Sequence, residues 1–209
     1  MEYVFLFLRD KIHLFDCFNM KTKIIHLQVI PKLSGVQRVS LEIMKQLPDS
    51  LYDKYILFGI TKDCGDKEEC LREFREAGCH IIIFPYMKRE IGWNDFNAML
   101  ELYRLFRREK FDIVHTNSTK PGFIGRIAAT VAGVPYVIHT VHGLAFHKFL
   151  TLPVWLFYWS CEMFASIFCD KIVLVNHHYM KYFKVFRYKV EIIYNGIDYL
   201  SLIHISEPT

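Results

Sequence analysis

Residues 111–146 read FDIVHTNSTKPGFIGRIAATVAGVPYVIHTVHGLAF, and the fold is best inferred from this stretch first. A short β-branched run at 113–116 is followed by apolar residues spaced three and four apart over 123–131. A second β-branched run occupies 136–141, and Gly133 between them is a typical helix stop. The spacing predicts two strands joined by one amphipathic helix.

Short strand-like runs also alternate with segments of helical apolar spacing before and after this stretch. Helical stripes are clearest at 36–47 and 96–106. The predicted strands are 23–30, 54–59, 80–85, 113–116, 136–141, 171–175 and 190–194. This order predicts an α/β fold with a Rossmann-like parallel sheet of about seven strands and helices on both faces.

Composition restricts the class of protein. The chain has 209 residues, 52% hydrophobic and 23% charged, which excludes a disordered or low-complexity chain and predicts one domain with a real core. Its net charge of +4 comes without long basic runs, so nucleic acid is not an expected partner. The 6 Cys include no C-x-x-C pair, so we expect no metal site, no disulfide framework and a cytoplasmic location.

The two ends differ from the rest of the chain. Residues 1–19 precede Met20 and the first predicted strand, and we interpret them as a non-native upstream extension. Residues 20–198 then form the domain, and 199–209 are a hinge remnant with an artefactual tail. The tail SLIHISEPT resembles the translated adaptor sequence that ends some fragmentary metagenomic genes; a genuine short tail is the alternative.

Ligands of parallel sheets bind beyond the carboxyl ends of the strands, so the loops there are informative. In the first, Ser34 and Gly35 precede a predicted helix whose first amides could face an anion. An ordinary tight turn would use the same glycine, and the loop does not match G-x-G-x-x-G.

The second such loop, residues 114–122, is rich in small polar groups that could hold sugar hydroxyls. Ser118 or Thr119 is placed to cap a helix that Pro121 begins. The alternative interpretation is that these polar residues only cap the helix and that His115 is a hydrogen-bonded histidine inside the fold.

The third loop follows the strand at 136–141. Strand alternation puts His139 on one face and Thr140 and His142 on the other, and Gly143 ends the strand. His142 is therefore expected at the edge of the sheet, where an imidazole can bind an oxygen of a sugar or phosphate. A lone histidine is commonly structural, but two histidines within five residues at the end of a strand favour a functional role.

Three segments, SGVQRVSLEIMKQL (34–47), the stretch 111–146 and IIYNGID (192–198), resemble the N-terminal half of the family-4 glycosyltransferases. These are retaining enzymes of the GT-B fold, and the resemblance covers about residues 23–198. It implies two Rossmann-like domains that face each other across a cleft, the first binding chiefly the acceptor and the second the nucleotide-sugar. This chain would supply the first domain, and 195–198 would be the hinge into the second.

The resemblance also implies roles for individual residues. Thr140 and His142 match the family's Thr-x-His motif, which would make His142 the catalytic residue beside the donor sugar. Asn117 stands where members usually carry a second histidine. Substrate-binding roles are implied for Ser34, Gly35, Arg38, His115, Asn117, Ser118, Lys120, Thr140 and Gly143. The first three of these match the family's glycine-rich loop and a basic position after it.

The function implied is a hexosyltransferase that moves a sugar from a nucleotide-sugar to a saccharide or lipid-linked acceptor in surface-polysaccharide synthesis. It would use no metal or other cofactor, and a chain without the donor-binding half would be inactive alone. The alternatives are one half of a nucleotide-sugar 2-epimerase of similar fold, or a non-catalytic flavodoxin-like binding module.

Residues 146–169 form an aromatic segment long enough to be considered as a membrane span. Pro153, Glu162 and the strand pattern that resumes at 171 favour a helix docked on the sheet instead. Aromatic residues all around this helix would leave apolar surface for a peripheral contact at the inner face of the plasma membrane. Basic residues could add attraction to anionic lipid or simply be solvated: Arg104, Arg107, Arg108 and Lys110.

Overall fold

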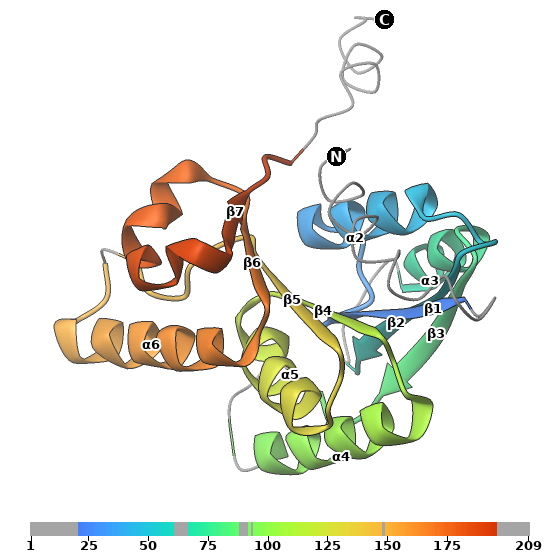
Figure 1. The fold of residues 1–209 in the computed structure, drawn as a ribbon, viewed down its shortest axis with the longest axis horizontal. Coiled ribbons are helices and arrows are strands. Elements are labelled where there is room, and N and C mark those ends of the chain that lie inside the picture. The colour runs from blue at the N-terminus through green and yellow to red at the C-terminus, as the bar shows by residue number, and fades with distance from the viewer. Residues whose placement is uncertain (1–20, 61–66, 88–91, 93, 148, 196–209) are drawn as a thin grey trace, which may run out of the picture.

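The computed structural model describes residues 21–60, 67–87, 92, 94–147 and 149–195 (Figure 1). Seven strands form one parallel sheet in the order β3-β2-β1-β4-β5-β6-β7. Helices cover both of its faces, so the predicted α/β Rossmann-like sheet is confirmed. The expectations for 1–19 and 199–209, and most of the proposed hinge, concern residues outside the described parts.

The elements follow one another as the sequence predicts. The strands are β1 (Thr22–Gln28), β2 (Tyr52–Gly59), β3 (Cys79–Phe84), β4 (Ile113–Asn117), β5 (Tyr136–Val141), β6 (Lys171–Leu174) and β7 (Val190–Ile192). The α-helices are α2 (Gly35–Gln46), α3 (Lys67–Glu76), α4 (Asn94–Glu109), α5 (Thr119–Val131) and α6 (Leu152–Ala165). The described residues also form 3-10 helices: η2 (Ser166–Phe168), η3 (His177–Tyr182) and η4 (Lys184–Lys189).

Several predicted strand ends differ from the structure by one or two residues, and the predicted start of one helix is wrong. The helix expected to begin at Pro121 begins at Thr119, so Pro121 is its third residue. The first-turn N–H groups of a helix have no partner within it, and a proline without an N–H is therefore tolerated there. Ser118 occupies the N-cap position as expected, but its side chain makes no capping hydrogen bond.

Alternating strand residues divide the core into two layers. Ile24, Ile56 and Phe58 pack with α2 and α3 on one face, whereas Ile25 and Leu27 pack with α4 and α5 on the other. Because these strands are buried on both faces, apolar residues occur at odd and at even positions along them.

The central part of the aromatic segment forms α6, which lies beside α5 and extends outward from the sheet (Figure 1). Within α6, Glu162 and Ala165 are buried. Several large apolar side chains in and around the helix are exposed: Phe149, Leu152, Val154, Leu156, Phe157, Phe164 and Ile167. Among the described residues, no helix combines the length and the hydropathy that crossing a bilayer requires.

Candidate functional site

Three neighbouring strand ends bring polar side chains together. β4 pairs with β1 on one side, where His26 lies opposite His115, and with β5 on the other, where Asn117 lies opposite Thr140. Because side chains alternate along a strand, these residues and His142 share one face of the sheet. It is the face covered by α2, since Gln28 at the end of β1 donates to Ser40 of that helix.

His142 lies at the rim of this edge, directly after β5, and is partly exposed. Its Nε2 is 3.0 Å from Oδ1 of Asn117, the last residue of β4. Partial burial lowers the pKa of His142 to about 4. At neutral pH the ring is therefore uncharged, so it can bind a hydroxyl by a hydrogen bond but cannot act as a fixed cation for a phosphate.

Below the rim, a buried chain of hydrogen bonds crosses the three strands. His115 Nδ1 lies 3.0 Å from His26 Nε2, and His115 Nε2 lies 2.7 Å from Thr140 Oγ1. Burial, together with repulsion from His142, lowers the pKa of His115 to about 3. The pKa of His26 lies well below its ordinary value, first because of burial and then because of His115 and His142. The layer beneath the rim is thus neutral and hydrogen-bonded.

The opposite face of β5 carries a second polar group. His139 Nδ1 is 2.9 Å from Thr116 Oγ1, and its Nε2 is 3.6 Å from Glu162 Oε1 of α6. The same carboxylate oxygen lies 2.9 Å from Arg126 Nη2 of α5, a close approach of charges without hydrogen-bond geometry. Arg126 also donates to the backbone oxygen of Gly122 at 2.6 Å. These contacts fix α5 and α6 to β5, the strand that ends just before His142.

The first loop leads from β1 to α2 and so reaches the same edge of the sheet. Ser34 is the N-cap of α2, yet its hydroxyl contacts the Gln37 side chain and caps no backbone N–H. Gly35 is exposed, and a Cβ added there would meet nothing within 4 Å. No acidic side chain lies in the first turn, so its amides retain the capacity to face an anion. Arg38 is exposed one turn further on.

Two residues of the second loop differ in their surroundings. Ser118 has a φ of +68°, a left-handed backbone angle that is costly for a residue with a side chain. Lys120 Nζ lies 2.5 Å from Asp95 Oδ1 of α4, so its ammonium group faces the helix pair rather than the histidines.

The structure therefore brings together four of the residues singled out in the sequence: His115, Asn117, Thr140 and His142. Gly143 is exposed beside them. The substrate-binding and catalytic roles themselves stay predictions.

Two residues of the site were missed by the sequence analysis. His26 and Gln28 alternate with apolar neighbours inside the first strand, and that spacing was the available signal. The pairing of His26 with His115 of β4 depends on long-range register, which the sequence does not reveal.

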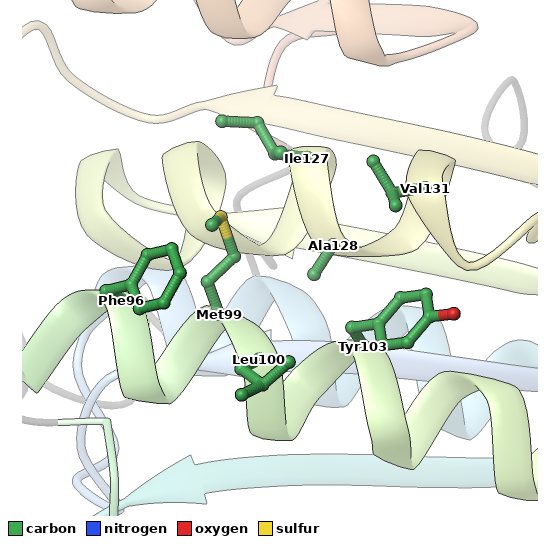
Figure 2. Close-up of a pocket in the computed structure, with 7 residues that line it drawn as sticks. All are labelled: Phe96, Met99, Leu100, Tyr103, Ile127, Ala128 and Val131. Atoms are coloured by element: carbon green, nitrogen blue, oxygen red, sulfur yellow. The ribbon is translucent and has the colours of Figure 1, made fainter.

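Among the described residues, no cluster of three or more His, Cys, Asp or Glu is arranged to hold a metal ion. An apolar hollow of about 230 Å³ lies between α4 and α5 (Figure 2). These two helices cover the face of the sheet opposite to the one covered by α2. The hollow is lined by Phe96, Met99, Leu100, Tyr103, Ile127, Ala128 and Val131. The surface that lines this hollow is apolar.

Comparison with known proteins gives one family. The sequence pattern of glycosyltransferase family 4 matches residues 33–199. A curated relative, the Escherichia coli UDP-Gal:alpha-D-GlcNAc-diphosphoundecaprenol alpha-1,3-galactosyltransferase, is 38% identical over 185 residues, which are 86% of this chain and 46% of the relative. The Staphylococcus aureus capsular polysaccharide biosynthesis glycosyltransferase CapM is 32% identical over 123 residues, 58% of this chain and 29% of that protein. The chain thus spans less than half the length of the curated relatives it matches.

Solved structures share the fold at low sequence identity. A glycosyltransferase from Rickettsia africae superposes with a TM-score of 0.61 at 18% identity, over 85% of this chain and 44% of its own. The UDP-GlcNAc 2-epimerase from Neisseria meningitidis gives a TM-score of 0.58 at 12% identity, over 82% of this chain and 46% of its own. Transferases and epimerases both have this architecture, so the fold alone does not separate them.

Proposed function

The chain belongs to glycosyltransferase family 4, and from that premise we propose that it is the acceptor-side domain of a retaining hexosyltransferase. The reaction would move a sugar from a nucleotide-sugar to a lipid-linked saccharide during surface-polysaccharide synthesis, at the cytoplasmic face of the plasma membrane. The observation that carries this proposal is the family match over 33–199, which includes the rim where His142 contacts Asn117.

In the proposed reaction the acceptor saccharide lies against the edge formed by β1, β4 and β5. A neutral His142 binds a hydroxyl there by a hydrogen bond, consistent with its low pKa of about 4. The uncapped amides at the start of α2 are suited to a phosphate group, because they point outward at the positive end of a helix dipole. Sugar transfer itself would require a donor-binding domain on the other side of the crevice.

A binding measurement on the chain tests this assignment. We expect a short-chain α-GlcNAc diphosphate lipid analogue, titrated by calorimetry, to bind at least ~10-fold more tightly than UDP-galactose. His142→Ala should weaken analogue binding by ~10-fold, about 1.4 kcal/mol, whereas exposed His178→Ala on η3 should not. Equal affinity for both ligands, or a preference for UDP-galactose, would contradict an acceptor-side domain.

The 2-epimerase alternative shares the fold, but the family match and the 38% identical galactosyltransferase favour transfer. An epimerase half would bind a UDP-sugar and not the lipid diphosphate, so the same titration separates the two. A flavodoxin-like binding module would bind neither ligand.

The same function requires access to a lipid-linked substrate, and α6 supplies a suitable surface. Phe149 is 83% exposed and Leu152 is 69% exposed, more than a purely solvated surface would favour. Tyr182 of η3 packs against Trp155 of α6. Exposed basic side chains of η3 and η4 therefore lie near this apolar surface: Lys181, Lys184 and Arg187.

The basic residues of α4 are a weaker source of attraction to lipid, since Arg104 and Arg108 pair with neighbouring glutamates. We therefore attribute the peripheral membrane contact to α6 with η3 and η4. The chain should co-sediment with vesicles containing phosphatidylglycerol, and replacing Phe149 and Leu152 by Ser should release it. Leu51→Ser, an exposed site away from α6, serves as control. If the wild-type chain stays in the supernatant, the proposed membrane contact is contradicted.

A further inference from the structure

Asn117 contacts His142 through its amide oxygen, which can only accept a hydrogen bond. The 3.0 Å contact joins His142 Nε2 to the amide oxygen Oδ1 of Asn117. An amide oxygen accepts hydrogen bonds and cannot donate, so Nε2 carries the proton. Since a neutral imidazole holds one proton, Nδ1 is left with a lone pair.

The position of Asn117 is strongly constrained by the fold. It is 1% exposed, ends β4, and is followed by Ser118 with its φ of +68°. That turn ends the strand immediately after the Asn117 side chain and before α5 begins. Backbone strain of this kind persists where the surroundings require it, often at functional sites.

The remaining polar groups around His142 do not compete for its Nε2. Among the described residues, the imidazoles of His26, His115 and His139 interact electrostatically with it. His115 is engaged with His26 and Thr140, and His139 with Thr116 on the other face of the sheet. Asn117 Nδ2 is buried without a hydrogen-bond partner among the described residues. Within the described residues, the side-chain amide of Asn117 therefore makes its hydrogen bond to His142.

We propose that Asn117 is a positioning residue that holds His142 in its Nε2–H tautomer and leaves Nδ1 as the acceptor for a hydroxyl of the bound saccharide. This inference rests on the proposed function for the identity of the ligand. The choice of tautomer rests on the geometry alone.

Imidazole nitrogen NMR of the full chain tests the proposal without substrate. With histidine labelled by 15N and His142 assigned through His142→Gln, long-range proton–nitrogen correlations at pH 7.5 should show a protonated Nε2 and an unprotonated Nδ1. The Nε2 proton should exchange with water at least tenfold faster in Asn117→Ala. Asn117→Asp retains the acceptor and adds a negative charge, so it should keep the tautomer and raise the pKa of His142 from about 4.

Asn176→Ala is the matched control, because Asn176 accepts from the His178 backbone at the end of another strand and should leave the His142 signals unchanged. A protonated Nδ1 in the wild type, or unchanged proton exchange in Asn117→Ala, would overturn the proposal. Adding the lipid diphosphate analogue should then shift the Nδ1 signal. Failure of the analogue to bind contradicts the proposed function while the tautomer stands, so the two failures are distinguishable.

Discussion

Gly122 and His139 illustrate how closely single residues are matched in this domain. A Cβ added to Gly122 would lie 2.5 Å from His139 Cε1, closer than real contacts allow. The ring cannot easily move away, because Thr116 and Glu162 contact its two nitrogens. Glycine at 122 is therefore required by space rather than by backbone angle.

The first prediction belongs to this contact. Gly122→Ala should lower the free energy of unfolding by ~1–3 kcal/mol, as overpacking of a tight core does. Gly35→Ala, also in the first turn of a helix but with open space around it, should leave stability unchanged or slightly higher. Urea unfolding of both variants measures the difference. Equal stability of the two would contradict the packing argument.

At the scale of elements, one carboxylate fixes α6. Glu162 lies 2.9 Å from Arg126 of α5 and 3.6 Å from His139 of β5, and both partners are buried. Glu162 is one of the two buried residues of α6, so this carboxylate lies where the helix meets the rest of the domain. The sequence suggested that Glu162 argues against a membrane span; its partners became visible only in the structure.

The second prediction follows from that attachment. Glu162→Gln removes the charge that compensates buried Arg126, and should cost ~3–5 kcal/mol of stability. Glu101→Gln, which breaks the exposed pair with Arg104 on α4, should change stability by less than ~0.5 kcal/mol. Thermal unfolding of both variants provides the comparison. A loss of similar size in both would show that the buried pair has no special weight.

Local sequence patterns predict the elements of this fold but not the contacts between them. The alternation of β-branched runs and helical stripes gave all seven strands and the carboxyl-end position of His142, because both depend on residues within one window. The pairing of His26 with His115 and the contact of Asn117 with His142 join residues far apart in the chain. They depend on strand order and register, which tertiary packing decides.

For the whole molecule, the buried histidines dominate the response to pH. Burial lowers the pKa of four imidazole rings: His26, His115, His139 and His142. In the folded state these rings therefore stay neutral at pH values below the ordinary pKa of histidine. Below about pH 6.5 these four rings take up protons in the unfolded chain but stay neutral in the folded chain. Stability must therefore fall as the pH falls below this value, by up to ~1.4 kcal/mol per pH unit for each ring that stays neutral.

The third prediction is a steep acid dependence. The urea midpoint should be nearly constant above pH 7 and fall between pH 6.5 and about 4, where His142 begins to titrate in the folded state. His26→Gln should reduce this slope, whereas exposed His178→Gln should leave it unchanged. A midpoint that is flat from pH 7.5 to 5 would mean that these rings are not held neutral by the fold.

The central claim is that the edge made by β1, β4 and β5, with His142 at its rim, binds the acceptor saccharide. Amide and imidazole NMR of the full chain during titration with the GlcNAc diphosphate lipid analogue tests it most directly. We predict that the largest shifts occur at Ser34, Gly35, Asn117, Thr140 and His142, with none at the hollow between α4 and α5. Shifts concentrated at Met99, Tyr103 and Ile127, with the His142 signals unchanged, would contradict the account.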